Sequence, residues 1–179
     1  MPSVRTQNAI RNADPGLAGF SLVELLVVVM VILIIAAIAI PNLVQGKMRA
    51  NEAAAVSSVK TINTAQLMYS DAFPEVGYAS SLANLGTHGS SCEKPTSTNG
   101  CLIMDEALTS GLKSGYMFEI VADGNTPAAS YTVTATPESG FSGRCSISSN
   151  EGGDIHISLP GSPSSGGGKS VGVAGSGCE

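Results

Sequence analysis

Glu24 is the one ionisable side chain within the long apolar segment at residues 20–40, where Ser21 is the only other polar residue. An ionised carboxylate in hydrocarbon costs several kcal/mol unless a cation pairs with it. No lysine, arginine or histidine lies between residues 20 and 46. We therefore expect Glu24 to pair with a positive group from outside its own segment. The alternative is an acid tolerated near the start of a helix, where the macrodipole favours negative charge.

The cysteines form a second group of residues that could do chemistry. All lie in the C-terminal half of the chain: Cys92, Cys101, Cys145 and Cys178. An even number of cysteines predicts two disulfides in an oxidising compartment, so we expect this half to be exported. Free or differently paired thiols are the alternative. No CxxC pair occurs, and His88 and His156 are far apart in the sequence, so we expect no metal site.

Motifs for catalysis or ligand binding are weak. The GGGKS at residues 166–170 resembles the end of a phosphate-binding loop, but the position of its first glycine is Pro163. Asn150, Glu151 and Asp154 could offer oxygens to calcium, but their pattern matches no recognisable calcium-binding loop, and a polar hairpin turn is the simpler interpretation. The chain contains no HExxH, and no histidine lies beside a cysteine or serine constellation that spacing could identify. We expect no enzyme activity and no cofactor.

Charge argues against nucleic acid as the main partner. Lysine and arginine number 9 against 14 acidic residues, which gives a net charge of -5. A protein that neutralises many phosphates needs a basic surface. No run of lysine and arginine supplies one here.

The element that carries Glu24 is predicted to be one long helix from about residue 20 to residue 73. Residues 20–40 would span about 30 Å as a helix, enough to cross a bilayer core. A secretory signal peptide is the rival interpretation, but its apolar core is usually shorter. Pro41 and Gly46 predict a kink or a locally melted stretch, and Pro74 ends the helix.

Beyond Pro41 the helix becomes amphipathic. Its apolar positions recur at helical spacing: Met48, Ala55, Val59, Ile62, Tyr69 and Phe73. Its opposite face is predicted to be polar, with Lys47, Asn51, Ser58 and Asn63. Such a helix buries one face against another element.

The remaining chain predicts a small antiparallel sheet. Two short helices are expected at residues 80–85 and 104–112. Four segments alternate apolar and polar residues and are separated by turn formers, at 116–121, 130–136, 144–148 and 154–159. A meander is the simplest topology. The Gly/Ser-rich stretch 161–177 has the composition of a flexible tail, and Cys178 is expected to tie down its end.

Gly19 precedes the sequence FSLVELLVV, with Glu24 fifth after the glycine and Pro41 twenty-second. This pattern resembles the prepilin N-terminal motif shared by type IV pilins and type II secretion pseudopilins. The resemblance implies an α+β pilin-like fold, a long N-terminal helix packed on a small antiparallel sheet. The implied regions are a leader at 1–19, a transmembrane and filament-core helix at 20–40, an amphipathic half at 41–74 and an exported head at 75–179.

Roles for individual residues follow from the resemblance. A prepilin peptidase is implied to cut between Gly19 and Phe20 and to N-methylate Phe20, and Glu24 is implied to guide assembly. The chain departs from many family members in having Ala18 instead of a lysine or arginine before the glycine, which bears on cleavage efficiency.

Disulfide pairing is predicted from spacing and from the family resemblance. Spacing favours Cys92–Cys101, which closes a compact surface loop, among three possible connectivities. Cys145–Cys178 would close a C-terminal loop as in the family.

The function implied is a structural, major pilin-like subunit of a type IV pilus. Its partners would be other copies of itself, prepilin peptidase, an assembly platform with a separate ATPase motor, and inner-membrane lipid before assembly. The precursor would cross the inner membrane once with its head in the periplasm. A type II secretion pseudopilin and a minor tip pilin that binds a surface ligand are the alternatives. Electron conduction through aromatic side chains is weaker than ordinary packing as an account of Phe20, Tyr69, Phe73 and Tyr78.

Overall fold

The computed structural model of the chain describes residues 20–87, 92 and 94–159. Two compact units divide the chain, Met1–Pro41 and Asn42–Glu179. One helix, α1 (Leu22–Ala72), begins in the first unit and ends in the second. Its bounds lie close to the predicted helix from about residue 20 to residue 73.

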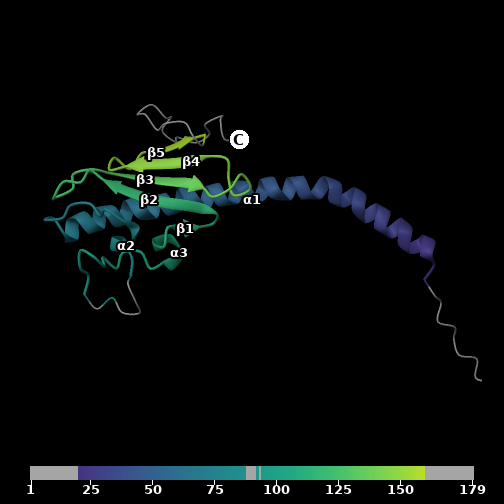
Figure 1. Cartoon of the computed structure of the whole chain (residues 1–179), viewed down its shortest axis with the longest axis horizontal. Helices are drawn as coiled ribbons and strands as arrows, with labels where there is room; N and C mark the ends of the chain where they lie inside the picture. Colours follow the sequence, from purple (N-terminus) through teal and green to yellow (C-terminus); the bar gives the residue numbers. More distant parts are fainter. Residues whose placement is uncertain (1–19, 88–91, 93, 160–179) are drawn as a thin grey trace, which may run out of the picture. The chain divides into compact units, whose positions relative to one another are not determined.

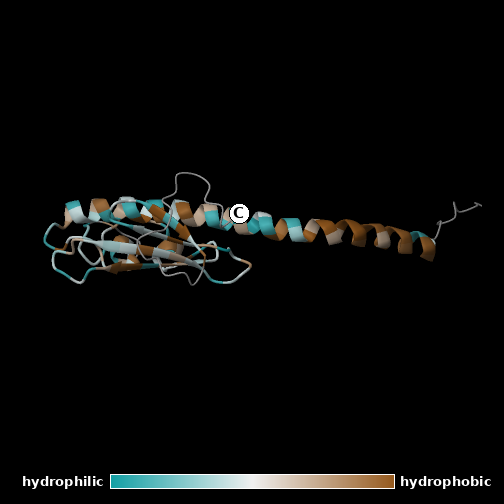
Figure 2. Cartoon of the chain, turned by 90° about the horizontal axis from the view of Figure 1, so that it is seen from above, coloured by the Kyte–Doolittle hydropathy of each residue, from teal (hydrophilic) through white to brown (hydrophobic). Residues whose placement is uncertain are grey.

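In the first unit, α1 is apolar in nearly every position (Figure 2). Among the described residues, α1 is the one helix long and apolar enough to cross a membrane by length and composition. Valine and isoleucine lose side-chain freedom in a helix, so their propensity does not explain this segment. In an apolar environment such a segment would be helical, because every backbone N–H and C=O would have to pair within it.

In the second unit, α1 turns its apolar stripe into the head. Ala55, Val59, Ile62 and Tyr69 are completely buried, which confirms the predicted apolar face. The predicted polar face is partly wrong, because Ser58 and Asn63 are also buried. Asn63 is tolerated in the core because its side chain is hydrogen-bonded.

Two short helices follow, each capped by a side chain. In α2 (Leu82–Leu85) the Ser81 hydroxyl accepts the Asn84 amide, and in α3 (Glu106–Thr109) Asp105 has this role. The prediction of helix as far as residue 112 is wrong. Gly111 adopts a positive φ of 87°, and the chain then enters a strand.

Five antiparallel strands form one sheet in sequence order, as the meander prediction requires (Figure 1). They are β1 (Leu112–Lys113), β2 (Tyr116–Ala122), β3 (Tyr131–Pro137), β4 (Ser146–Asn150) and β5 (Ile155–Ser158). The two-residue β1 was not predicted, because alternation cannot be read over so short a segment.

Alternation along β2 shows how the sheet covers α1. Tyr116, Phe118 and Ile120 are buried, whereas the intervening side chains are exposed. The inward side chains of β2, β3 and β4 share one hydrophobic core with the buried stripe of α1. The α+β, pilin-like fold class is therefore confirmed.

Candidate assembly segment and its supporting head

Phe20 and Glu24 lie one helical turn apart in sequence at the start of α1. Phe20 lies two residues before the first residue of the helix and is 77% exposed, and Glu24 lies in the first turn of the helix. The Leu25 amide donates to the Ser21 carbonyl at 3.2 Å, which makes this turn helical. A carboxylate here is favoured by the positive end of the helix dipole. Gly19, the predicted cleavage partner of Phe20, lies outside the described residues.

The large apolar side chains of α1 in the first unit are all exposed. Their exposed fractions range from 46% at Val29 to 78% at Leu22. An uninterrupted apolar surface of this length is covered in functional proteins by lipid or by other protein. The apolar surface of the first unit is thus suited to contact with lipid or with other protein.

α1 remains helical through Pro41 and Gly46. A locally melted stretch is therefore not present in this structure, and the bend predicted at these residues stays a prediction. Apart from the adjoining backbone of α1, a methyl group added at Gly46 would meet no atom of the described residues within 4 Å. Close packing within the chain therefore does not explain why this helical position is a glycine.

The loop after β3 is fastened to α1 by side chains of the helix. Asn51 Nδ2 donates to the Ser142 carbonyl at 2.8 Å, and the Glu52 carboxylate accepts the Arg144 amide at 2.7 Å. The Tyr116 hydroxyl donates to the Cys145 carbonyl at 2.9 Å. Burial raises the pKa of Tyr116 to about 12, with a smaller contribution from the Glu52 charge. The two bonds from α1 join residues 91 and 92 positions apart in sequence.

A buried polar cluster joins the middle of α1 to the sheet. Asn63 Nδ2 donates to the Ser149 hydroxyl at 2.7 Å, and the Tyr131 hydroxyl donates to Asn63 Oδ1 at 3.2 Å. Burial raises the pKa of Tyr131 to about 12. One turn further, the Gln66 amide bonds both backbone groups of Ala79. This cluster was not predicted from the sequence, where the available signal was an asparagine and a glutamine within the helical stripe.

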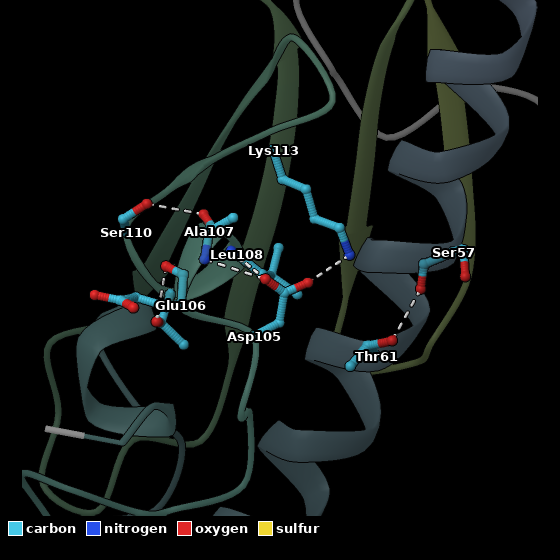
Figure 3. Close-up of polar contacts among 9 residues, drawn as sticks. Ser57, Thr61, Asp105, Glu106, Ala107, Leu108, Ser110 and Lys113 are labelled. Atoms are coloured by element: carbon cyan, nitrogen blue, oxygen red, sulfur yellow. Dashed lines mark hydrogen bonds and ion pairs between the residues drawn. The ribbon is translucent and has the colours of Figure 1, made fainter. Parts of the chain in front are cut away.

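Asp105 combines two roles at the start of α3, as Figure 3 shows. One carboxylate oxygen accepts the Ala107 and Leu108 amides at 3.1 and 3.3 Å, and the other lies 2.7 Å from the Lys113 amine. The bond to Lys113 is the main cause that lowers the pKa of Asp105. The side chain links α3 to β1.

The predicted disulfide between Cys92 and Cys101 is confirmed. It closes a loop that also docks on the head. The Gly100 amide donates to the Asn84 carbonyl at 2.7 Å, and the Tyr69 hydroxyl donates to the Ser97 carbonyl. Cys145 is disulfide-bonded as well. Its predicted partner, Cys178, lies outside the described residues, as do residues 166–170.

The suggested calcium ligands Asn150, Glu151 and Asp154 lie at the turn between β4 and β5. In the β4–β5 turn, Asn150 Oδ1 accepts the Gly152 amide at 3.2 Å. Within residues 20–87, 92 and 94–159, no three His, Cys, Asp or Glu side chains cluster as metal ligands would. The ring pairs Tyr69–Phe73 and Tyr78–Tyr131 have centroids 4.9 and 4.7 Å apart, as in core packing.

Comparison with known proteins finds a similarity to a pilin, in agreement with the pilin-like fold. Over 78 residues the chain is 38% identical to the type IV major pilin protein PilA of Myxococcus xanthus (strain DK1622). The match covers 40% of this chain and 36% of the length of that pilin. No family model and no solved structure matches the chain. The similarity supports the pilin family and a pilin-like, structural role for a membrane-anchored chain.

Proposed function

We propose that the chain is a structural subunit of a type IV pilus, cleaved between Gly19 and Phe20, N-methylated at Phe20 and polymerised into a helical filament. The observation that carries the proposal is the exposed apolar part of α1 with one carboxylate, Glu24, four residues after Phe20. The similarity to a major pilin supports the same role.

A charge pair between neighbouring copies would fix the axial position at which a new subunit docks. In a lipid or protein environment the Glu24 carboxylate needs a cation, and its own segment has none. Cleavage before Phe20 creates an amino group on every copy, and methylation retains its positive charge. When a new copy docks, Glu24 pairs with the Phe20 amine of a neighbouring copy in one axial position. The same contact repeats head to tail without closing, which is the condition for an open filament.

The apolar segment and the head have different locations and roles before and after assembly. Before assembly, the leader at residues 1–19 lies on the cytoplasmic side, residues 20–40 cross the inner membrane and the head is periplasmic. Prepilin peptidase processes this precursor, and an assembly platform with a separate ATPase motor extracts it from the lipid. In the filament, apolar helices form the core and heads form the surface.

The test is the N-terminus of the polypeptide in filaments sheared from the cell surface, measured by mass spectrometry. We expect an abundant chain that begins at N-methylated Phe20. Processed chain confined to the cell envelope would instead indicate a secretion pseudopilus, and trace amounts in filaments would indicate a minor tip subunit. An unprocessed Met1 terminus would contradict the proposal and leave a plain membrane anchor.

A further inference from the structure

The loop at residues 138–145 lies beside the first turns of α1 in the second unit. Two helix side chains fix it there, Asn51 to the Ser142 carbonyl and Glu52 to the Arg144 amide. Asn51 is nine residues from Asn42, where α1 enters this unit, which is roughly 14 Å along a helix. We call residues 42–52 and 138–145 the proximal surface, because the apolar segment leads directly into it.

The proximal surface has two exposed apolar side chains, Leu43 on its helix and Phe141 on its loop. The Phe141 side chain is 76% exposed, next to Ser142 and Arg144, whose backbone groups are bonded to the helix. Gly143, two residues later, packs so closely on the Tyr116 ring that a side chain there would collide with it. The loop is therefore a fixed support, and the phenylalanine projects from it into solvent.

Three exposed cations accompany Phe141: Lys47, Arg49 and Arg144. In the part of the chain that the structure describes, the ion pair is Lys113–Asp105, so none of the three is neutralised by a salt bridge there. The acids of the same surface are Glu52 and Glu138, and Glu52 is engaged with the Arg144 amide.

The opposite end of the second unit has the opposite charge. The Gly77–Ala128 bridge and the Thr132–Asn150 pairing bring together residues 71–78, 122–131 and 149–155. These segments contain no lysine or arginine and carry the following acids: Asp71, Glu75, Asp123, Glu151 and Asp154. An anionic surface would attract the proximal end of the head and repel this one.

We propose that the proximal surface binds anionic phospholipid headgroups, with Phe141 entering the headgroup layer and Lys47, Arg49 and Arg144 contacting phosphates. This inference rests on the proposed function only in requiring that residues 20–40 be embedded in a bilayer. Connectivity then holds residues 42–52 at the membrane before any filament exists. Aromatic side chains next to lysine and arginine suit this interface, because the ring leaves water while the charges stay at the phosphates. The contact would hold the head in one orientation while the subunit waits for assembly.

The test uses a fluorophore that the chain lacks. The sequence has no tryptophan, so Phe141→Trp introduces a single probe into the full chain, reconstituted in vesicles. We expect a blue-shifted emission, and quenching by lipids brominated near the headgroup that is at least about twofold greater with phosphatidylglycerol than with phosphatidylcholine alone. Val121→Trp, an exposed position near the far end of β2, is the control and should show neither effect.

Charge removal tests the cations. Changing Lys47, Arg49 and Arg144 to glutamine in the chain that carries Phe141→Trp should abolish the phosphatidylglycerol-dependent quenching, since each cation near an anionic bilayer contributes roughly fivefold to binding. Lys60→Gln with Lys94→Gln, also exposed but away from the proximal surface, should leave the quenching unchanged. Circular dichroism checks that each variant keeps the fold.

Two results would overturn the lipid contact. One is equal quenching in the two kinds of vesicle, and the other is a blue shift that disappears on lowering the protein-to-lipid ratio, which would indicate a second copy of the chain instead. Neither result bears on processing or polymerisation, because N-methylated Phe20 in sheared filaments is measured separately.

Discussion

At the scale of single residues, buried tyrosine hydroxyls make the head sensitive to alkali. Tyr116 and Tyr131 are almost completely buried, and burial raises the pKa of each to about 12. Folding raises the pKa of each phenol, so the folded state is favoured over the unfolded state only while the phenol stays protonated. The stability that it contributes is present below its ordinary pKa of about 10 and is lost as the pH rises towards 12.

Tyr131→Phe should therefore change the shape of the stability profile. At neutral pH we expect a loss of about 1 kcal/mol in the free energy of unfolding, because the bond to Asn63 is removed. Between pH 10 and 12, stability should fall less steeply than in the parent chain, because one raised pKa is gone. Urea unfolding across this range measures both effects. An unchanged slope above pH 10 would show that Tyr131 does not titrate on unfolding.

Asp105 makes a separable contribution at the start of α3. Asp105→Asn keeps an acceptor for the Ala107 and Leu108 amides but loses the ion pair with Lys113, whereas Asp105→Ala loses both. Because the ion pair is partly exposed, we expect Asn to cost a few tenths of a kcal/mol and Ala about 1 kcal/mol. Thermal unfolding at pH 7 distinguishes them.

The acid limb provides a check on the same residue. The pKa of Asp105 is lowered in the folded chain, so its contribution is present above the ordinary carboxyl pKa of about 4 and is lost as the pH falls further. The difference between the parent and Asp105→Ala should shrink below about pH 4. A constant difference would contradict a role for the charge.

At the scale of elements, Gly46 makes α1 locally flexible and lowers the stability of the helix in the isolated chain. The methyl group of Gly46→Ala meets no atom of the described residues beyond the adjoining helix backbone, so we expect the helix around it to become more stable by about 0.5–1 kcal/mol. Hydrogen exchange of the amides in this turn, with the chain in detergent, measures the change. Ala50→Gly, at an exposed position one turn later, is the matched control and should shift protection in the opposite direction.

The filament yield of Gly46→Ala tests whether assembly depends on flexibility of α1 at this position. If bending or stretching at Pro41 and Gly46 is used in the filament, Gly46→Ala should reduce the yield of sheared filaments although it stabilises the helix. An undiminished yield would show that the filament does not use this weakness.

At the scale of the whole molecule, Glu24 should matter only when copies meet. Glu24→Gln is nearly isosteric, retains a polar group and removes the charge. We expect at least about a tenfold loss of filaments, because breaking a buried ion pair is costly, with normal membrane insertion and an unchanged melting temperature of the head. Glu75→Gln, an exposed acid in the head, should leave filament yield unchanged. Equal yields from the two variants would contradict the pairing with Phe20.

Different parts of the structure were accessible to sequence reasoning for different reasons. The long helix and the four main strands follow from hydropathy patterns that extend over many residues, so their bounds were predicted within about two residues. β1 and the end of α3 were missed because two residues show no period, and because the positive φ of Gly111 decides where the helix stops.

What the sequence by itself determined is the apolar segment with Glu24 near its start, the sheet order and the Cys92–Cys101 pair, since hydropathy, alternation and short loop spacing are local properties of the chain. Only the tertiary structure decided the partners of Asn63, which lie 68 and 86 residues away, and the docking of the loop at 138–145 on Asn51, 91 residues away. The physical reason is that a polar side chain satisfies itself with whichever group the packed core brings within hydrogen-bonding distance. No local pattern records which group that will be.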